Sequence, residues 1–221
     1  ADPMFVGQHV WSEAEASARC VRKQQPDERV GVFVRRGGQF AVIEYSELSD
    51  AMRKARREGG DALLFDMGNI AVHMLSCEFL ERAAREDLVP PYHLAKERIS
   101  YLDRKGRRVQ PALPNCVRFE CDIFDVFPLA KKVCLFEAAR ADEFYPVNTA
   151  HGPCSPEDVQ RAMSERYGAW LARAGATLPR DERGSPRGTY EISPLFARDA
   201  DELKEKLDVS TFVAGDSLYL E

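Results

Sequence analysis

A carboxylate closes an apolar strand pattern in the first third of the chain. In the run 40–45, side chains alternate between the two faces of the expected strand, so Glu44 shares a face with Phe40 and Val42. A carboxylate on an apolar face is costly unless it lies in a cleft or has a partner. Because its oxygens accept hydrogen bonds firmly, Glu44 would suit the hydroxyl groups of a sugar. The alternative, a strand that simply ends with Glu44 in water, stays open.

A second polar group follows the next expected strand. The apolar run 62–65 predicts a short strand, and Gly68-Asn69-Ile70 predicts a turn into a helix that begins at Ile70. Ligands of α/β sheets bind beyond the carboxyl ends of strands. An amide both donates and accepts hydrogen bonds, as a sugar hydroxyl or an acetamido group requires. Asn69 is therefore a candidate sugar ligand, and a plain helix cap at Asn69 or Asp66 is the alternative.

The run 114–125 supplies an arginine and an aromatic ring. The guanidinium of Arg118 could bind a phosphate through two hydrogen bonds, and the ring of Phe124 could line a pocket. Each has a simpler alternative. Arg118 could form an ion pair with Glu120 or Asp122, and an aromatic residue at helical spacing is more often part of the core.

Motifs that hold phosphate or metal are missing from the sequence. It contains no G-x-x-x-x-G-K-[ST] loop, no G-x-G-x-x-G and no G-x-S-x-G. Cys116 and Cys121 are five positions apart, but no second pair completes a zinc set. The cysteines lie mostly in apolar runs, which predicts reduced thiols and a cytoplasmic location. The histidines show no metal spacing: His9, His73, His93 and His151.

Charge and hydropathy narrow the classes of partner. The 221 residues carry 31 Lys and Arg against 36 Asp and Glu, a formal net charge of −5. This balance argues against a nucleic-acid partner bound through phosphate neutralisation. No apolar run approaches the ~20 residues that cross a bilayer, so no membrane span is expected. The oligomeric state has no signal in the sequence.

Strand and helix patterns alternate up to about residue 140, which predicts an α/β layered domain. Apolar runs with a glycine-bearing turn predict a hairpin of strands at 30–34 and 40–45. A second hairpin is expected at 99–102 and 107–109, and further strands at 62–65, 117–120 and 133–138. Helices are expected at 12–23, from a capping box at Ser12 and Glu15, and at 46–58, 76–86 and 123–131.

The last 70 or so residues predict a small α+β domain. Ser155-Pro156 starts a helix that Gly175 ends, and a polar loop covers 178–188. A strand at 190–195, a helix at 199–207 and a hairpin over Gly215-Asp216 are expected to follow. We therefore divide the chain into residues 1–145 and 146–221.

Short segments in a distinctive order run through the first 195 residues. They are 1–7 (A-D-P-M-F-V-G), 30–32 (V-G-V), 42–47 (V-I-E-Y-S-E), 63–73 (L-L-F-D-M-G-N-I-A-V-H), 114–115 (P-N), 124–127 (F-D-V-F), 130–132 (A-K-K), 142–146 (D-E-F-Y-P) and 191–195 (E-I-S-P-L). Taken together, these segments resemble the UDP-N-acetylhexosamine pyrophosphorylase family of eukaryotes. The E-Y-S-E, G-N-I and E-I-S-P-L pieces are specific only in combination.

The resemblance implies part of a Rossmann-like nucleotide-diphospho-sugar transferase domain followed by a small α+β domain. It implies a uridylyltransferase that joins UTP and N-acetylglucosamine 1-phosphate with Mg²⁺ and releases pyrophosphate. The positions that match the family's sugar-holding residues are Gly31, Glu44, Asn69 and Phe124, and Tyr45 is the partner of Glu44 in its motif.

Departures from the family pattern limit this expectation. The family's glycine-rich loop has no counterpart here, so the chain resembles the carboxyl-terminal part of a longer enzyme and is expected to be inactive alone. The family's sugar-phosphate lysine is missing near Asn148, Arg118 stands in place of another lysine, and Asp122 stands in place of an aromatic residue. A non-catalytic relative that binds a UDP-sugar or a partner chain, and an enzyme with another sugar preference, are the alternatives.

Overall fold

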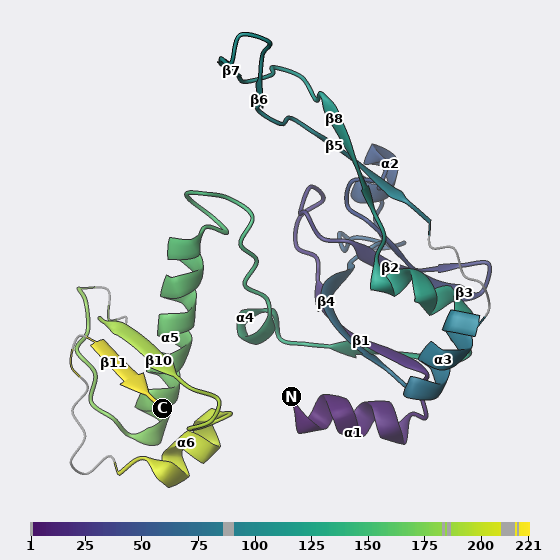
Figure 1. Cartoon of the computed structure of the whole chain (residues 1–221). Helices are drawn as coiled ribbons and strands as arrows, with labels where there is room; N and C mark the ends of the chain where they lie inside the picture. The colour runs from purple at the N-terminus through teal and green to yellow at the C-terminus, as the bar shows by residue number, and fades with distance from the viewer. Residues whose placement is uncertain (1, 86–90, 183, 185–186, 209–214, 216) are drawn as a thin grey trace. The chain divides into compact units, whose positions relative to one another are not determined.

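The computed structural model of the chain describes residues 2–85, 91–182, 184, 187–208, 215 and 217–221 (Figure 1). These residues form two compact units, 1–140 and 141–221. The predicted α/β class is confirmed, because the first unit combines a mixed sheet with helices. The domain limits at 145 and 146 stay a prediction. No helix in the described part of the chain has the length and apolar character that crossing a bilayer requires.

A mixed sheet organises the first unit. Its strand order is β3-β2-β4-β1-β9, with β1 parallel to β9 and antiparallel to β4. β2 is antiparallel to both β3 and β4. The strands are β1 (Ala16–Arg22), β2 (Val32–Arg36), β3 (Gln39–Ile43), β4 (Met67–Leu75) and β9 (Val133–Glu137). The carboxyl ends of β1 and β9 therefore lie at the same edge of the sheet.

Small side chains on β1 let larger ones pack closely against the sheet. Ala16, Ala18 and Cys20 are fully buried on one strand face, as the two-residue period requires. Helix α3 (Cys77–Arg85) and the 3-10 helix η1 (Ile123–Leu129) pack on this core. The aromatic rings that fill it are those of Phe33, Phe79, Phe124 and Phe127. The predicted helices at 76–86 and 123–131 are thus confirmed in place, the second as a 3-10 helix.

The helix predicted at 12–23 is wrong. Helix α1 (Pro3–Trp11) has Ser12 as its C-cap rather than a helix beginning there, and β1 follows. Glu15 does not complete a capping box; its carboxylate pairs with both terminal nitrogens of Arg82 at 2.5 and 2.8 Å. Pairing of this segment with β4 and β9 buries it, and that tertiary gain outweighs a local capping preference.

The hairpin predicted after residue 30 is confirmed. β2 and β3 pair antiparallel across Gly37 and Gly38, whose φ angles of 59° and 86° suit a two-residue hairpin turn. The surface helix expected at 46–58 is shorter. It is α2 (Asp50–Lys54), capped by the Ser49 side chain.

The strand at 62–65 and the helix start at Ile70 are also wrong. Leu63 forms an isolated bridge with Arg56, and the strand begins later, as β4. Asn69 therefore lies within a strand and pairs with Cys20 of β1. Gly68 permits this pairing, because a Cβ atom there would lie 3.1 Å from the Val21 carbonyl oxygen.

Two further strand pairs extend from the sheet as a ribbon (Figure 1). The inner pair is antiparallel, and the outer pair is the hairpin predicted around residues 99–109. The strands are β5 (His93–Glu97), β8 (Cys116–Glu120), β6 (Tyr101–Leu102) and β7 (Arg108–Val109). At the end of the ribbon nearest the sheet, His93 of β5 pairs with Glu120 of β8 and lies next to η1.

The second unit has its own core. Its long helix begins after the Ser155 cap and ends at Gly175, which has φ 102°, so both predicted helix ends are confirmed. β10 and β11 pair in parallel. The hairpin expected over Gly215-Asp216 stays a prediction, because its first strand at 210–214 lies outside the described residues. Helix α4 (Arg140–Glu143) begins at the last residue of the first unit. The other elements are α5 (Pro156–Ala174), β10 (Thr189–Ile192), α6 (Ala200–Lys206) and β11 (Ser217–Leu220).

Candidate functional site

Glu44 lies directly over the backbone of Gly31. Continuing the β2–β3 register one pair beyond Val32 and Ile43 places the two residues opposite each other. A Cβ atom on Gly31 would lie 2.7 Å from Glu44 Oε1 and 3.2 Å from Val42 Cγ1. The carboxylate therefore occupies the space that any larger residue at position 31 would need.

Asn69 also contacts Gly31. Its backbone N–H donates to the Gly31 carbonyl oxygen at 2.8 Å. Its side-chain oxygen accepts from the Ala71 N–H at 3.1 Å and from His73 Nε2 at 2.9 Å. Burial lowers the pKa of His73, so the neutral ring donates from Nε2. With the side-chain oxygen satisfied, the NH₂ group of Asn69 is the part of the amide available to a ligand.

Phe124 closes the cluster as an apolar wall. Its ring is 7% exposed and lies 6.4 Å from the ring of His73 and 5.9 Å from the ring of His93, between centroids. His73 also packs edge-on to Phe127. Phe124 is thus both a core residue and a neighbour of the polar cluster, so the two alternatives for it are compatible.

His93 connects two carboxylates beside Phe124. Its Nδ1 lies 2.9 Å from Glu47 Oε1, and its Nε2 lies 3.1 Å from both oxygens of Asp125. Burial lowers the pKa of His93, but hydrogen bonds to Glu47 and Asp125 outweigh burial and raise it to about 9. The ring is therefore an imidazolium near neutral pH.

Negative charge is in excess around this imidazolium. Burial and the charge of Asp122 raise the pKa of Glu44, which the nearby His93 partly lowers again. Burial also raises the pKa of Asp122, with Asp125 and Glu120 adding repulsion. Carboxylates held this way gain from a ligand that donates hydrogen bonds, as a sugar does.

Two residues expected at the site lie at its margin. Tyr45 follows Glu44 with its side chain 40% exposed, and its carbonyl oxygen accepts from Arg53 at 3.0 Å. Arg118 lies on β8 and pairs with Glu97 at 2.8 Å and with Glu120 at 2.9 Å. The ion-pair alternative for Arg118 is therefore present, and a phosphate contact stays a prediction.

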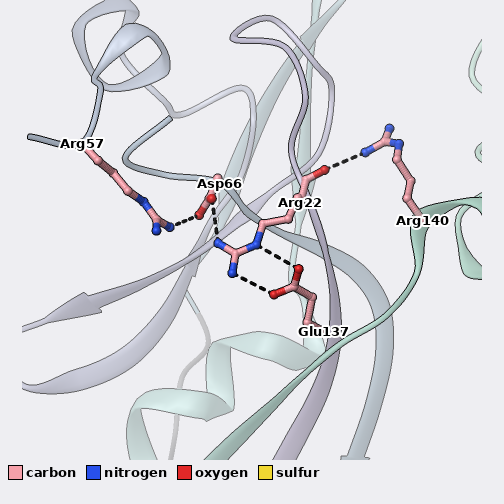
Figure 2. A network of polar contacts seen from close by, with 5 residues as sticks. All are labelled: Arg22, Arg57, Asp66, Glu137 and Arg140. Carbon is pink, nitrogen blue, oxygen red and sulfur yellow. Dashed lines mark hydrogen bonds and ion pairs between the residues drawn. The ribbon is translucent and has the colours of Figure 1, made fainter. Parts of the chain in front are cut away.

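A second polar cluster lies at the carboxyl ends of β1 and β9 (Figure 2). The guanidinium of Arg22 donates to both oxygens of Glu137 at 3.0 and 2.8 Å, and to Asp66 at 2.7 Å. Arg57 binds the other oxygen of Asp66 at 2.7 Å, and Arg140 donates to the Arg22 carbonyl oxygen at 3.1 Å. Hydrogen bonds from Arg22 lower the pKa of Glu137. The acids shown here are matched by arginines.

Metal ligation has no support among the residues that the structure describes. No group of three His, Cys, Asp or Glu side chains there is arranged to hold an ion. Mg²⁺ is usually held by one or two carboxylates together with substrate phosphates, so the Mg²⁺ that the resemblance implies stays a prediction. All six cysteines are free thiols, and burial raises the pKa of Cys20 to about 11.

The chain is similar to solved structures of UDP-sugar pyrophosphorylases. A crystal structure from Entamoeba histolytica assigned as a UDP-N-acetylglucosamine pyrophosphorylase has a TM-score of 0.74 at 30% identity, covering 99% of this chain and 52% of its own. The Trypanosoma brucei uridine diphosphate N-acetylglucosamine pyrophosphorylase has a TM-score of 0.72 at 23% identity, and the match covers 100% of this chain and 46% of that protein. The fold is accordingly that of the nucleotide-diphospho-sugar transferases.

Curated proteins narrow the class to one family, although no family model matches the chain. A Xenopus tropicalis protein named UDP-N-acetylhexosamine pyrophosphorylase-like protein 1 is 37% identical over 96% of this chain and 45% of its own length. UDP-N-acetylglucosamine diphosphorylase 2 of Arabidopsis thaliana is 34% identical over 97% of this chain and 42% of its own length. The chain belongs to the UDP-N-acetylhexosamine pyrophosphorylase family and matches its carboxyl-terminal portion. It spans about half the length of these relatives or less.

Sequence reasoning missed the histidine at the centre of the cluster. From the sequence, His93 is a candidate only for metal ligation, for which its spacing is wrong. Glu47 and Asp125 lie in two of the segments that carry the resemblance, and the sequence alone indicates no role for either. A signal was present, since each lies within three residues of a predicted sugar ligand, but only the fold brings His93 between them.

Proposed function

We propose that this chain is the sugar-binding portion of a uridylyltransferase that joins UTP and N-acetylglucosamine 1-phosphate. The observation that carries the proposal is the contact of Glu44 with Gly31, whose carbonyl oxygen binds the backbone of Asn69. These residues match the family's sugar-holding positions, and they meet although they lie far apart in sequence. The names of the curated relatives support the same class of reaction.

Each residue has a distinct task in this proposal. The Glu44 carboxylate accepts hydrogen bonds from sugar hydroxyls, and the Asn69 NH₂ group donates to a hydroxyl or acetamido oxygen. Phe124 provides an apolar wall, and the glycine at position 31 leaves room for Glu44. Tyr45 and Arg118 lie at the edge of the proposed sugar site. Of the two, Arg118 has the side chain that could bind a phosphate.

The reaction requires alignment more than a protein nucleophile. An oxygen of the sugar phosphate attacks the α-phosphorus of UTP, the bond to the β-phosphate oxygen breaks, and pyrophosphate leaves with that electron pair. This chain holds and orients the sugar, which fixes the attacking oxygen. Mg²⁺ belongs to the proposal as the ion that would neutralise phosphate charge. The free thiols favour a cytoplasmic setting.

A non-catalytic relative is the second candidate. Its supporting observations are the missing lysine near Asn148 and the acid at Asp122, whose pKa is raised by burial first and by repulsion from other acids second. Such a protein would bind a UDP-sugar or a partner chain without turnover. A preference for another sugar 1-phosphate would be decided by the acetamido contacts.

Pyrophosphate release separates these candidates. In the complete parent protein, we expect release from UTP and N-acetylglucosamine 1-phosphate, and we expect Asn69→Ala to raise KM for the sugar phosphate about tenfold. Asn115→Ala, on the ribbon, is the matched control and should leave KM unchanged. Binding of UDP-N-acetylglucosamine without release would favour the non-catalytic relative. Release by the 221-residue chain alone would contradict the expectation that it is inactive by itself.

A further inference from the structure

His93 is placed between two segments that carry the proposed sugar ligands. Glu47 is three residues beyond Glu44, and Asp125 directly follows Phe124. Both ring nitrogens of His93 face carboxylate oxygens, which can only accept, so both nitrogens donate. The ring thus joins the turn after β3 to the start of η1 through two charge-assisted hydrogen bonds.

The far ends of these hydrogen bonds are themselves fixed. Asp125 Oδ2 also accepts from the Asp122 backbone N–H at 3.2 Å, which closes the first turn of η1. The Glu47 backbone N–H donates to the Glu44 carbonyl oxygen at 3.0 Å. A movement of His93 would therefore be passed to the backbones of both Glu44 and the η1 turn that carries Phe124.

The imidazolium also opposes an excess of negative charge. The acids that face the cluster from the β3 turn, β8 and η1 are Glu44, Glu47, Glu120, Asp122 and Asp125. Of these, Glu120 is paired with Arg118. The positive charge of His93 favours the ionised form of Glu44, whereas the negative charge of Asp122 disfavours it. Loss of the His93 proton would leave these acids facing one another.

We propose that His93 is a positioning residue for the sugar of a UDP-N-acetylhexosamine, acting through Glu47 and Asp125 to hold Glu44 ionised over Gly31 and Phe124 in place. The proposal rests on the proposed function for its ligand. It predicts that sugar affinity follows the protonation of a residue that never touches the sugar.

Binding across a pH range is the direct test. Titrate UDP-N-acetylglucosamine into the full chain, following amide shifts by NMR, from about pH 7 to above pH 9. We expect affinity of the native chain to fall near pH 9, where the imidazolium is lost. His93→Gln should bind roughly tenfold more weakly near neutral pH, the size of one charge-assisted hydrogen bond, and should lack this alkaline decrease.

Matched variants separate positioning from general damage. His9→Gln is the control, since His9 is also hydrogen-bonded in the first unit, to Ser17 Oγ at 2.7 Å. It should bind as the native chain does. Glu47→Gln should weaken binding in the native chain, yet add less than about twofold to His93→Gln, because partners in one network are not additive. Additive losses, or an unchanged alkaline decrease in His93→Gln, would overturn the proposal.

A ligand-free measurement distinguishes failure of the two proposals. The Glu44 carboxyl carbon is followed by NMR as the pH changes in the native chain and in His93→Gln. We expect its titration to move to higher pH in the variant, because the favourable charge is gone. No sugar binding by the native chain would count against the proposed function alone. An unchanged Glu44 titration would overturn the role of His93 whether or not sugar binds.

Discussion

The first unit contains two polar clusters that balance charge in opposite ways. At the carboxyl ends of β1 and β9, Arg22 donates hydrogen bonds to Glu137 and Asp66. Arg57 donates to the other carboxylate oxygen of Asp66. Around Phe124, a single imidazolium faces several acids, and the pKa values of Glu44 and Asp122 are raised rather than lowered.

This difference indicates what each cluster contributes. Hydrogen bonds from Arg22 lower the pKa of Glu137, so the ionised form of Glu137 stabilises the fold. Where acids outnumber cations, the folded state carries a cost that a ligand can relieve. Costs of this kind concentrate at functional sites, so we assign stability to the Arg22 cluster and binding to the His93 cluster.

The largest effect is expected from removing the shared acid of the Arg22 cluster. Asp66→Ala leaves Arg22 and Arg57 without their common acceptor, in a place where the Asp66 side chain is 9% exposed. The two guanidiniums are about half exposed, so water replaces part of the lost contact, and we expect the free energy of unfolding to fall by about 2 kcal/mol, as for loss of a hydrogen bond to a charged group. Urea unfolding would measure it. Asp61→Ala, an exposed acid nearby, is the control, and equal losses in both would break the comparison.

Gly31→Ala should damage the other cluster through space alone. The added Cβ would lie 2.7 Å from Glu44 Oε1, so the carboxylate must move. We expect sugar affinity to fall at least about tenfold, with a loss of unfolding free energy near 1 kcal/mol. Gly7→Ala is the control, because nothing lies within 4 Å of its Cβ position in α1. Native affinity in Gly31→Ala would remove Glu44 from the site.

Glu44→Gln should separate binding from stability. Because burial raises the pKa of Glu44 in the fold, its ionised form costs stability above its usual pKa. The neutral amide should therefore leave the free energy of unfolding unchanged, or raise it by less than about 1 kcal/mol, while sugar affinity falls about tenfold. Thermal unfolding and calorimetric titration of the same samples test this. A clear loss of stability would place Glu44 with the structural acids.

The smallest effect belongs to Glu137. Its lowered pKa contributes stability above the usual value of 4.5, and that contribution disappears as the pH falls through the lowered folded value. The side chain is 48% exposed, so solvent screens the pair and Glu137→Gln should cost well under about 1 kcal/mol. The difference between native and variant unfolding should vanish in acid. A difference that persists there would mean that packing, rather than charge, explains it.

Local patterns predicted much of the framework. The β2–β3 hairpin follows from two β-rich runs around Gly37-Gly38, and both ends of α5 follow from Ser155 and Gly175. These features depend on φ preferences and caps within a few residues, which the sequence carries directly. The position of Glu44 at the end of a strand also follows from the local pattern, since β3 ends at Ile43.

Pairing between distant segments could not be predicted in the same way. Ser12 and Glu15 have the pattern of a capping box, yet the segment becomes β1 because β4 and β9 bury it. Asn69 was expected at a helix start and lies in β4. In both cases the burial gained by the sheet outweighs a local preference of about 1 kcal/mol.

The sequence by itself determined the residue types of the site, the family resemblance and the local turns and caps, because these depend on neighbours along the chain. Only the tertiary structure decided that Glu44 lies over Gly31, that Asn69 joins them from β4, and that His93 links Glu47 to Asp125. Contacts between residues tens of positions apart depend on which strands pair and what they bury, and no local spacing records that outcome.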